Sequence, residues 1–89
     1  MQIARVLKHI VATRKHEAYR GWKLLLVEPV DRHDDPAGEQ IVAVDLVDAG
    51  VDDLVLLSSE GRFAREMVGE SAPVRSTIVA IIEGMEYED

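Results

Sequence analysis

The feature that most constrains the fold of this chain is a succession of short apolar runs separated by turn residues. The runs are rich in valine, isoleucine and leucine, which favour strands, and the segments between them carry glycine, proline and aspartate. One further segment, Gly61 to Val68, has the spacing of a short helix, with Ser58 or Ser59 as its candidate N-cap. The expected strands are Gln2 to Thr13, Lys23 to Val27, Ile41 to Val47, Leu54 to Leu57 and Ile78 to Glu83.

Four or five strands with one short α-helix before the last strand predict a small, mainly β fold that closes partly into a barrel. A barrel removes the unpaired edges that a short open sheet would expose. The alternation of the first strand breaks around Lys8-His9, which predicts a bulge or a strong bend there. The run from Ile41 to Val47 is almost wholly apolar, so we expect it to be buried on both faces or against a neighbour.

The length of 89 residues is enough for one domain and not for two cores. We expect a single barrel domain over residues 1–84, followed by an acidic tail at 85–89. A domain of this size buries only somewhat over roughly 60% of the surface of its unfolded chain. Association with other chains is therefore a natural way to gain burial.

The charge balance argues against two classes of partner. The net charge is −7 and the isoelectric point is near 4.8, whereas nucleic acid and anionic membranes attract clustered lysine and arginine. The chain has no cysteine, so disulfides and thiolate sites do not arise. It also shows no secretory signal and no apolar run near the roughly 20 residues that span a bilayer, and we expect a soluble, intracellular protein.

No set of residues predicts catalysis. His9, His16 and His33 are scattered, and Ser58-Ser59 fits a helix cap better than a nucleophile. His33-Asp34-Asp35 could contribute to a metal site, but a solvated acidic turn is the favoured interpretation because adjacent side chains converge poorly on one ion. We therefore expect no catalytic residue, no metal and no cofactor.

Asp45 is the one charged residue inside the third apolar run. A buried carboxylate needs hydrogen-bond donors or a cation, because burial without them costs several kcal/mol. Asp45 either faces outward or pairs with a cation such as Arg65.

Several short blocks occur in a fixed order along the chain. They read Val11-Ala12-Thr13-Arg14-Lys15, Gly21-Trp22-Lys23-Leu24-Leu25-Leu26-Val27-Glu28-Pro29, Val42-Ala43-Val44-Asp45-Leu46-Val47-Asp48-Ala49-Gly50, Val55-Leu56-Leu57-Ser58-Ser59-Glu60-Gly61-Arg62-Phe63-Ala64-Arg65, and Pro73-Val74-Arg75 leading into Ile78-Val79-Ala80-Ile81-Ile82. In this order and spacing the chain resembles the pentameric vertex proteins of bacterial microcompartments, the EutN/CcmL family. The resemblance runs from Met1 to about Glu83.

The resemblance implies an OB-like barrel with its helix at one end and a structural role. Such a protein forms cyclic homopentamers that cap the vertices of a shell in the bacterial cytoplasm, beside hexameric or trimeric shell proteins. Each ring or trimer of shell proteins is one tile of the shell, and the resemblance places a set of residues at contacts between subunits or between tiles. These residues are Thr13, Lys15, Asp45, Ala49, Gly50, Gly61, Ala64 and Arg65. The alternative function is a small OB-like domain that binds a ligand or nucleic acid, although the basic groove and stacking aromatics that such domains use are missing.

The chain departs from the family pattern before the fourth strand. The family usually has Gly-Ala-Gly-x-Gly there, and this chain has Asp48-Ala49-Gly50-Val51-Asp52. Aspartate tolerates left-handed backbone better than most residues, so we expect the turn to survive and to become acidic.

Overall fold

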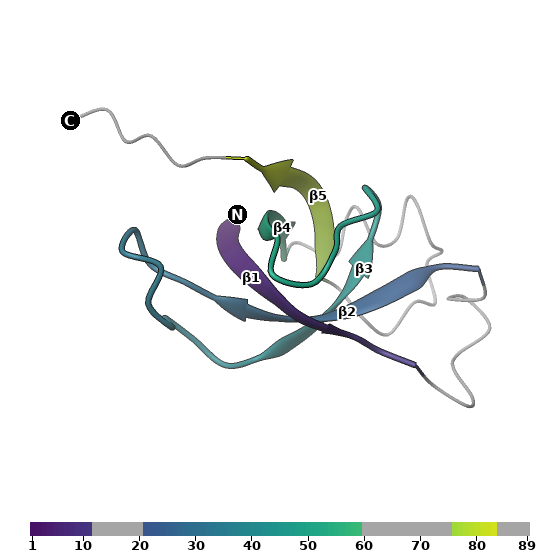
Figure 1. Ribbon diagram of the computed structural model, residues 1–89, viewed down its shortest axis with the longest axis horizontal. Coiled ribbons are helices and arrows are strands. Elements are labelled where there is room, and N and C mark those ends of the chain that lie inside the picture. Colours follow the sequence, from purple (N-terminus) through teal and green to yellow (C-terminus); the bar gives the residue numbers. More distant parts are fainter. Residues whose placement is uncertain (12–20, 60–75, 84–89) are drawn as a thin grey trace.

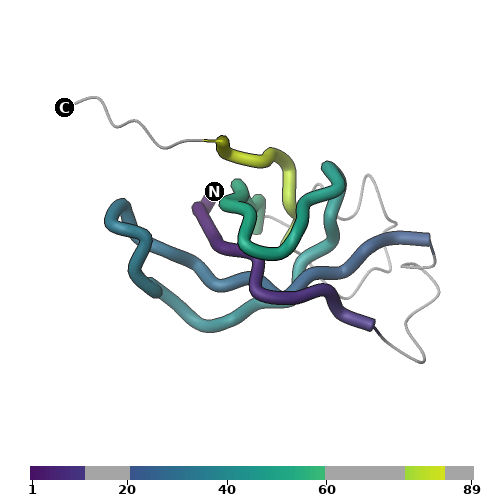
Figure 2. Tube along the Cα trace, in the orientation of Figure 1, coloured from purple at the N-terminus to yellow at the C-terminus, as the bar shows by residue number. Residues whose placement is uncertain are grey.

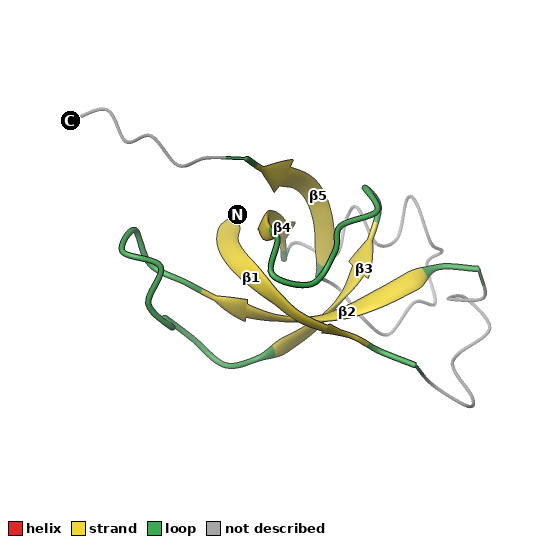
Figure 3. Ribbon diagram, in the orientation of Figure 1, coloured by secondary structure: helices red, strands yellow, loops and turns green. Residues whose placement is uncertain are grey.

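The computed structural model describes residues 1–11, 21–59 and 76–83, and these residues form a closed β-barrel (Figures 1 and 3). The strands are β1 (Gln2–His9), β2 (Lys23–Pro29), β3 (Ile41–Asp45), β4 (Leu54–Ser58) and β5 (Thr77–Ile82). Their order around the barrel is β1-β2-β3-β5-β4. The predicted five-strand barrel is therefore confirmed.

The predicted helix, Gly61 to Val68, and the tail at 85–89 lie outside the described residues. Within the described part of the chain, no helix is long and apolar enough to cross a membrane.

One pairing in the barrel differs from the others. All neighbouring strands run antiparallel except β3 and β5, which are parallel and share only the register pairs Val44 with Thr77 and Asp45 with Ile78. Backbone bonds from the Val44 amide to the Ser76 carbonyl (3.0 Å) and from the Leu46 amide to the Ile78 carbonyl (3.2 Å) hold this seam. The seam between β3 and β5 is thus the shortest contact in the barrel.

The connection from β3 to β4 has to bridge two strands that are not neighbours. Because β5 lies between them in the barrel, the chain leaves the sheet after Asp45, and residues 46–53 carry it to β4 (Figure 2). This segment, called the β3–β4 turn below, ends the third strand earlier than its apolar sequence suggests.

Bulges let these short strands bend around the barrel. In β1, Val6 lies opposite Val27 and Lys8 lies opposite Leu26, so Leu7 is the extra residue. The bulge expected near Lys8 is therefore confirmed. In β5 the register with β4 also shifts, between the partners of Leu56 and Leu57. An extra residue bends its strand and increases the local twist, as barrel closure requires.

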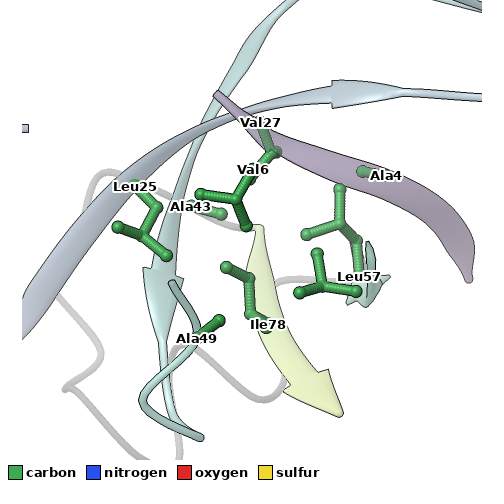
Figure 4. Close-up of a cluster of buried hydrophobic side chains, with 9 residues drawn as sticks. Ala4, Val6, Leu25, Val27, Ala43, Ala49, Leu57 and Ile78 are labelled. Carbon is green, nitrogen blue, oxygen red and sulfur yellow. The ribbon is translucent and has the colours of Figure 1, made fainter. Parts of the chain in front are cut away.

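The interior is filled by side chains from all five strands and from the β3–β4 turn (Figure 4). Three alanines lie among the larger valine, leucine and isoleucine side chains, which suits the narrow interior of a five-strand barrel. The buried cluster consists of Ala4, Val6, Leu25, Val27, Ala43, Ala49, Val55, Leu57 and Ile78.

A second apolar cluster covers the outer face of β2 and β3. Leu24 and Val44 are register partners in its centre and are buried. Around them pack the partly buried side chains of Ile10, Trp22, Val42 and Leu46. Since Ala43 lies in the interior and Val44 in this outer cluster, β3 is buried on both faces, as its apolar sequence predicts.

Candidate functional site

The β3–β4 turn and the residues that hold it form the candidate site, because three of the residues expected at contacts lie there. These are Asp45, which precedes the turn, and Ala49 and Gly50 within it. The other expected contact residues, Thr13, Lys15, Gly61, Ala64 and Arg65, lie outside the described residues.

Asp45 is buried, with 5% of its surface exposed, and its carboxylate organises the turn. One carboxylate oxygen accepts a hydrogen bond from the Val47 amide (3.0 Å), and the other accepts one from the Ala49 amide (2.8 Å). The Lys23 ammonium lies 3.3 Å from the second oxygen. The outward-facing alternative for Asp45 is therefore wrong, and the cation beside it is Lys23.

Lys23 joins β2 to the turn. It lies opposite Asp45 in the β2–β3 register, and its ammonium also donates to the Asp48 carboxylate (3.0 Å) and to the Ala49 carbonyl (2.5 Å). The hydrogen bond to Asp48 raises the pKa of Lys23, against a smaller opposing effect of desolvation and with further help from Asp45. The lysine thus links β2 to the turn through three oxygen atoms, on Asp45, Asp48 and Ala49.

Two consecutive residues in the middle of the β3–β4 turn differ in exposure. Ala49 is fully buried, and its methyl group packs in the interior cluster of its own chain. Gly50 is exposed, and its amide donates to the Asp53 carboxylate (2.8 Å). Of these two residues only Gly50 therefore has surface to offer to another molecule.

Two aspartates in the turn have left-handed backbone, as expected from the departure from the family pattern. The φ angle is 59° at Asp48 and 72° at Asp52. Asparagine and aspartate are enriched in this region, whereas bulkier residues avoid it. Aspartate therefore adopts left-handed backbone at two positions where the family usually has glycine.

Arg5 is a residue that the sequence analysis missed. Its guanidinium donates to the Asp52 carbonyl (2.7 Å) and pairs with the Asp34 carboxylate, so β1 is tied to the β3–β4 turn and to the loop after β2. The bond to Asp34 is the largest cause of a raised pKa for Arg5, against desolvation. The sequence feature that could have indicated this role is the position of Arg5 in a strand between Ala4 and Val6. Both neighbours are buried, so the alternation of the strand directs Arg5 outward.

The acidic loop at 31–35 uses its polar groups locally. The Asp31 carboxylate accepts hydrogen bonds from the amides of Asp35 (3.1 Å) and His33 (2.8 Å), and both bonds lower the pKa of Asp31. Asp34 is paired with Arg5. Over residues 1–11, 21–59 and 76–83, no three metal-ligating side chains come together. The loop is exposed and its hydrogen bonds are local, as expected of an acidic turn.

The charged groups of Lys23, Asp45 and Arg5 all hold the β3–β4 turn in place. Lys23 and Asp45 neutralise each other beneath the turn, and Arg5 fixes the turn from its other side. In this arrangement the ionisable groups bind backbone amides, carbonyls and each other. The site is therefore built to hold one shape at the end of the barrel.

Comparison with known proteins gives one family. The family model described as ethanolamine utilisation protein EutN/carboxysome matches residues 1–83. The carboxysome shell vertex protein CcmL of Nostoc sp. (strain PCC 7120) is 43% identical over 91 residues, which cover 100% of this chain and 89% of that protein. The microcompartment shell vertex protein EutN of Escherichia coli (strain K12) is 34% identical, over 93% of this chain and 87% of that protein.

Solved structures agree in fold. A structure of the ethanolamine utilization protein EutN superimposes with a TM-score of 0.86 at 32% identity and covers 98% of this chain and 91% of that chain. The GrpN pentameric microcompartment shell protein from Rhodospirillum rubrum has a TM-score of 0.84 at 31% identity, with 99% and 100% of the two chains covered.

We expect Asp45→Ala to lower the free energy of unfolding by about 2–3 kcal/mol, because two backbone amides and Lys23 lose a charged acceptor. Urea denaturation at a fixed protein concentration measures this, since association would add to the apparent stability.

The control is Asp48→Gly, which removes a carboxylate whose side chain is 95% exposed and relieves its left-handed backbone. It should change stability by less than about 1 kcal/mol. Equal losses in the two variants would contradict the role given to Asp45.

Proposed function

This chain belongs to the EutN/CcmL family, and from that membership we propose that it is a structural shell protein whose cyclic pentamer closes the vertices of a bacterial microcompartment. The observation that carries the proposal is the match of the family model to residues 1–83. The pentameric shell protein GrpN, with which this chain shares its fold over 99% of its length, supports the five-fold ring. The place of action is the microcompartment shell in the bacterial cytoplasm.

The physical argument for the role is geometric. Flat hexagonal tiles alone extend into sheets, and a closed polyhedral shell needs pentagonal tiles to supply curvature. A head-to-tail interface that closes after five copies provides such a tile, and ring closure prevents growth into filaments. The role needs a fixed shape and no reaction, so we propose that the protein is not an enzyme and that it uses no cofactor.

Two features of the chain support self-association. The interior of a five-strand barrel is small, and the outer cluster on β2 and β3 leaves Trp22, Val42 and Leu46 only partly buried. Apolar surface of this kind gains free energy when a second chain covers it. We propose identical copies and the edges of hexameric or trimeric shell proteins as partners, and neither nucleic acid nor a membrane.

The contact residues follow from the family blocks and from the geometry of the turn. We propose that Thr13, Lys15, Gly61, Ala64 and Arg65 lie at subunit or tile contacts, together with exposed Gly50. Asp45 and Ala49 are buried in their own chain, so their contribution is to fix the shape that the turn presents. We place all of these residues in one shell domain over residues 1–84.

The first prediction from the proposed function concerns assembly. The isolated chain should be a pentamer in solution, because the outer apolar cluster is left incompletely covered in one chain. Native mass spectrometry at micromolar concentration measures the number of copies directly. A spectrum dominated by monomer would refute the pentamer and would favour the alternative of a small ligand-binding barrel.

The second prediction concerns the contact between subunits. Arg65→Ala should weaken assembly while the single chain remains folded, because arginine offers a planar set of donors suited to a fixed interface. Loss of one partner from a buried charged contact typically costs about 2–5 kcal/mol. Arg62→Ala is the matched control, with the same substitution three positions earlier in the sequence. Unchanged assembly of the Arg65 variant by dilution and native mass spectrometry would place Arg65 outside the contact.

The third prediction concerns the cell. Deletion of the protein should leave shells that are elongated or open, with leakage of small intermediates, because hexagonal tiles still form facets without vertices. The enclosed enzymes should remain active. Electron microscopy and an assay for escape of intermediates test this in a strain from which every vertex protein has been removed. Closed and sealed shells in that strain would show that the vertex role is mistaken.

A further inference from the structure

An open hollow of about 610 Å³ lies on the outer surface where β1, β4 and β5 run side by side. Its floor is a row of register partners, Arg5 on β1, Leu54 on β4 and Ile82 on β5. Asp52 and Asp53 of the β3–β4 turn close one side, and Ile81 and Glu83 complete the lining.

The apolar floor of the hollow is partly exposed at Ile82, beside the buried Leu54. The preceding residue, Ile81, lies opposite the buried Val55, so its side chain points to the other face of the sheet from Ile82, and it is 41% exposed. The reason is that β3 pairs with β5 only at Thr77 and Ile78, so among the described residues the later part of β5 has β4 alone as its neighbour. Apolar surface next to an incomplete strand contact is a place where another chain gains burial.

The charged part of the hollow is negative. Three carboxylates line it, from Asp52, Asp53 and Glu83, against one guanidinium. That guanidinium, of Arg5, is already paired with Asp34, and the Asp53 carboxylate already accepts the Gly50 amide. Within the described part of the chain, neither a hydrogen bond nor an ion pair engages the carboxylates of Asp52 and Glu83.

We propose that this hollow receives a lysine or arginine side chain from a different protein. The aliphatic stem of such a side chain would pack on Leu54 and Ile82, and its charged head would meet Asp52 and Glu83. A neutral or acidic segment would instead cover these two carboxylates without pairing them, which is unfavourable. This inference goes beyond the proposed function, because it assigns a surface and a partner chemistry that do not depend on five-fold assembly.

The probe is a capped five-residue peptide with valine at its odd positions and lysine at its even positions. It is titrated to millimolar concentration into the isotope-labelled full chain, in whichever oligomer that chain forms, and amide resonances are followed by NMR. We expect shifts centred on Leu54, Ile81 and Ile82, and weaker binding when salt is raised, because exposed charge pairs are screened. The same peptide with glutamine in place of lysine should bind more weakly.

Two variants of the same turn distinguish binding in the hollow from a general attraction of the lysine peptide to the negative charge of the chain. Asp52→Asn removes one carboxylate of the hollow and keeps a residue that adopts left-handed backbone readily. It should raise the dissociation constant of the lysine peptide roughly two- to fivefold, the effect of one exposed ion pair. Asp48→Asn makes the same change in the same turn, outside the hollow, and should leave the constant unchanged.

Several results would overturn the proposal. Equal binding of the lysine and glutamine peptides would show that the carboxylates are not used, and equal weakening by the two variants would show attraction to the whole acidic chain. A peptide that shifts no resonance of the hollow would show that the surface is closed to other proteins. A changed number of copies in Asp52→Asn, read by native mass spectrometry, would show instead that a second copy of this chain covers it.

Discussion

The structure depends on one buried carboxylate at the point where β3 leaves the sheet. In the closed barrel β5 lies between β3 and β4, so the chain has to leave the sheet after Asp45 to reach β4. The Asp45 carboxylate accepts the amides of Val47 and Ala49, and Lys23 neutralises it from β2. Ala49 is thereby turned into the interior, where its methyl group packs among the strands. An electrostatic contact thus fixes the backbone, and the apolar core is completed as a result.

The strands and the turns were predictable from the sequence because their signals are local. Apolar runs and the break around Lys8 locate the strands and a bulge, and aspartates in the β3–β4 turn adopt the left-handed backbone expected of them. The partners of Asp45 and Arg5 were not predictable. They come from strands and loops distant in the sequence, and only the register of β2 on β3 brings Lys23 opposite Asp45. The contacts proposed for Thr13, Lys15 and Arg65 remain predictions, since these residues lie outside the described chain.

A five-strand barrel does not by itself specify a function, because similar barrels serve many purposes. The surface of this one is more informative. The outer cluster around Val44 is apolar, whereas the hollow beside Leu54 combines apolar and negative groups. Apolar surface suits association between identical chains, and an acidic hollow suits a partner of opposite charge. Family membership and surface chemistry therefore point in the same direction, toward a protein that acts through its contacts.

The short seam between β3 and β5 is the place where the barrel has the fewest strand contacts to break. β1, β2 and β3 form a continuous antiparallel meander, and β4 and β5 form a second antiparallel unit that is joined to it along β1. Two register pairs hold the opposite side. Local unfolding begins where the fewest interactions must break. We expect thermal fluctuations to part the barrel first at this seam, with the β1–β4 pairing as the hinge, and the backbone amides of the seam to exchange with solvent faster than those of the antiparallel pairings.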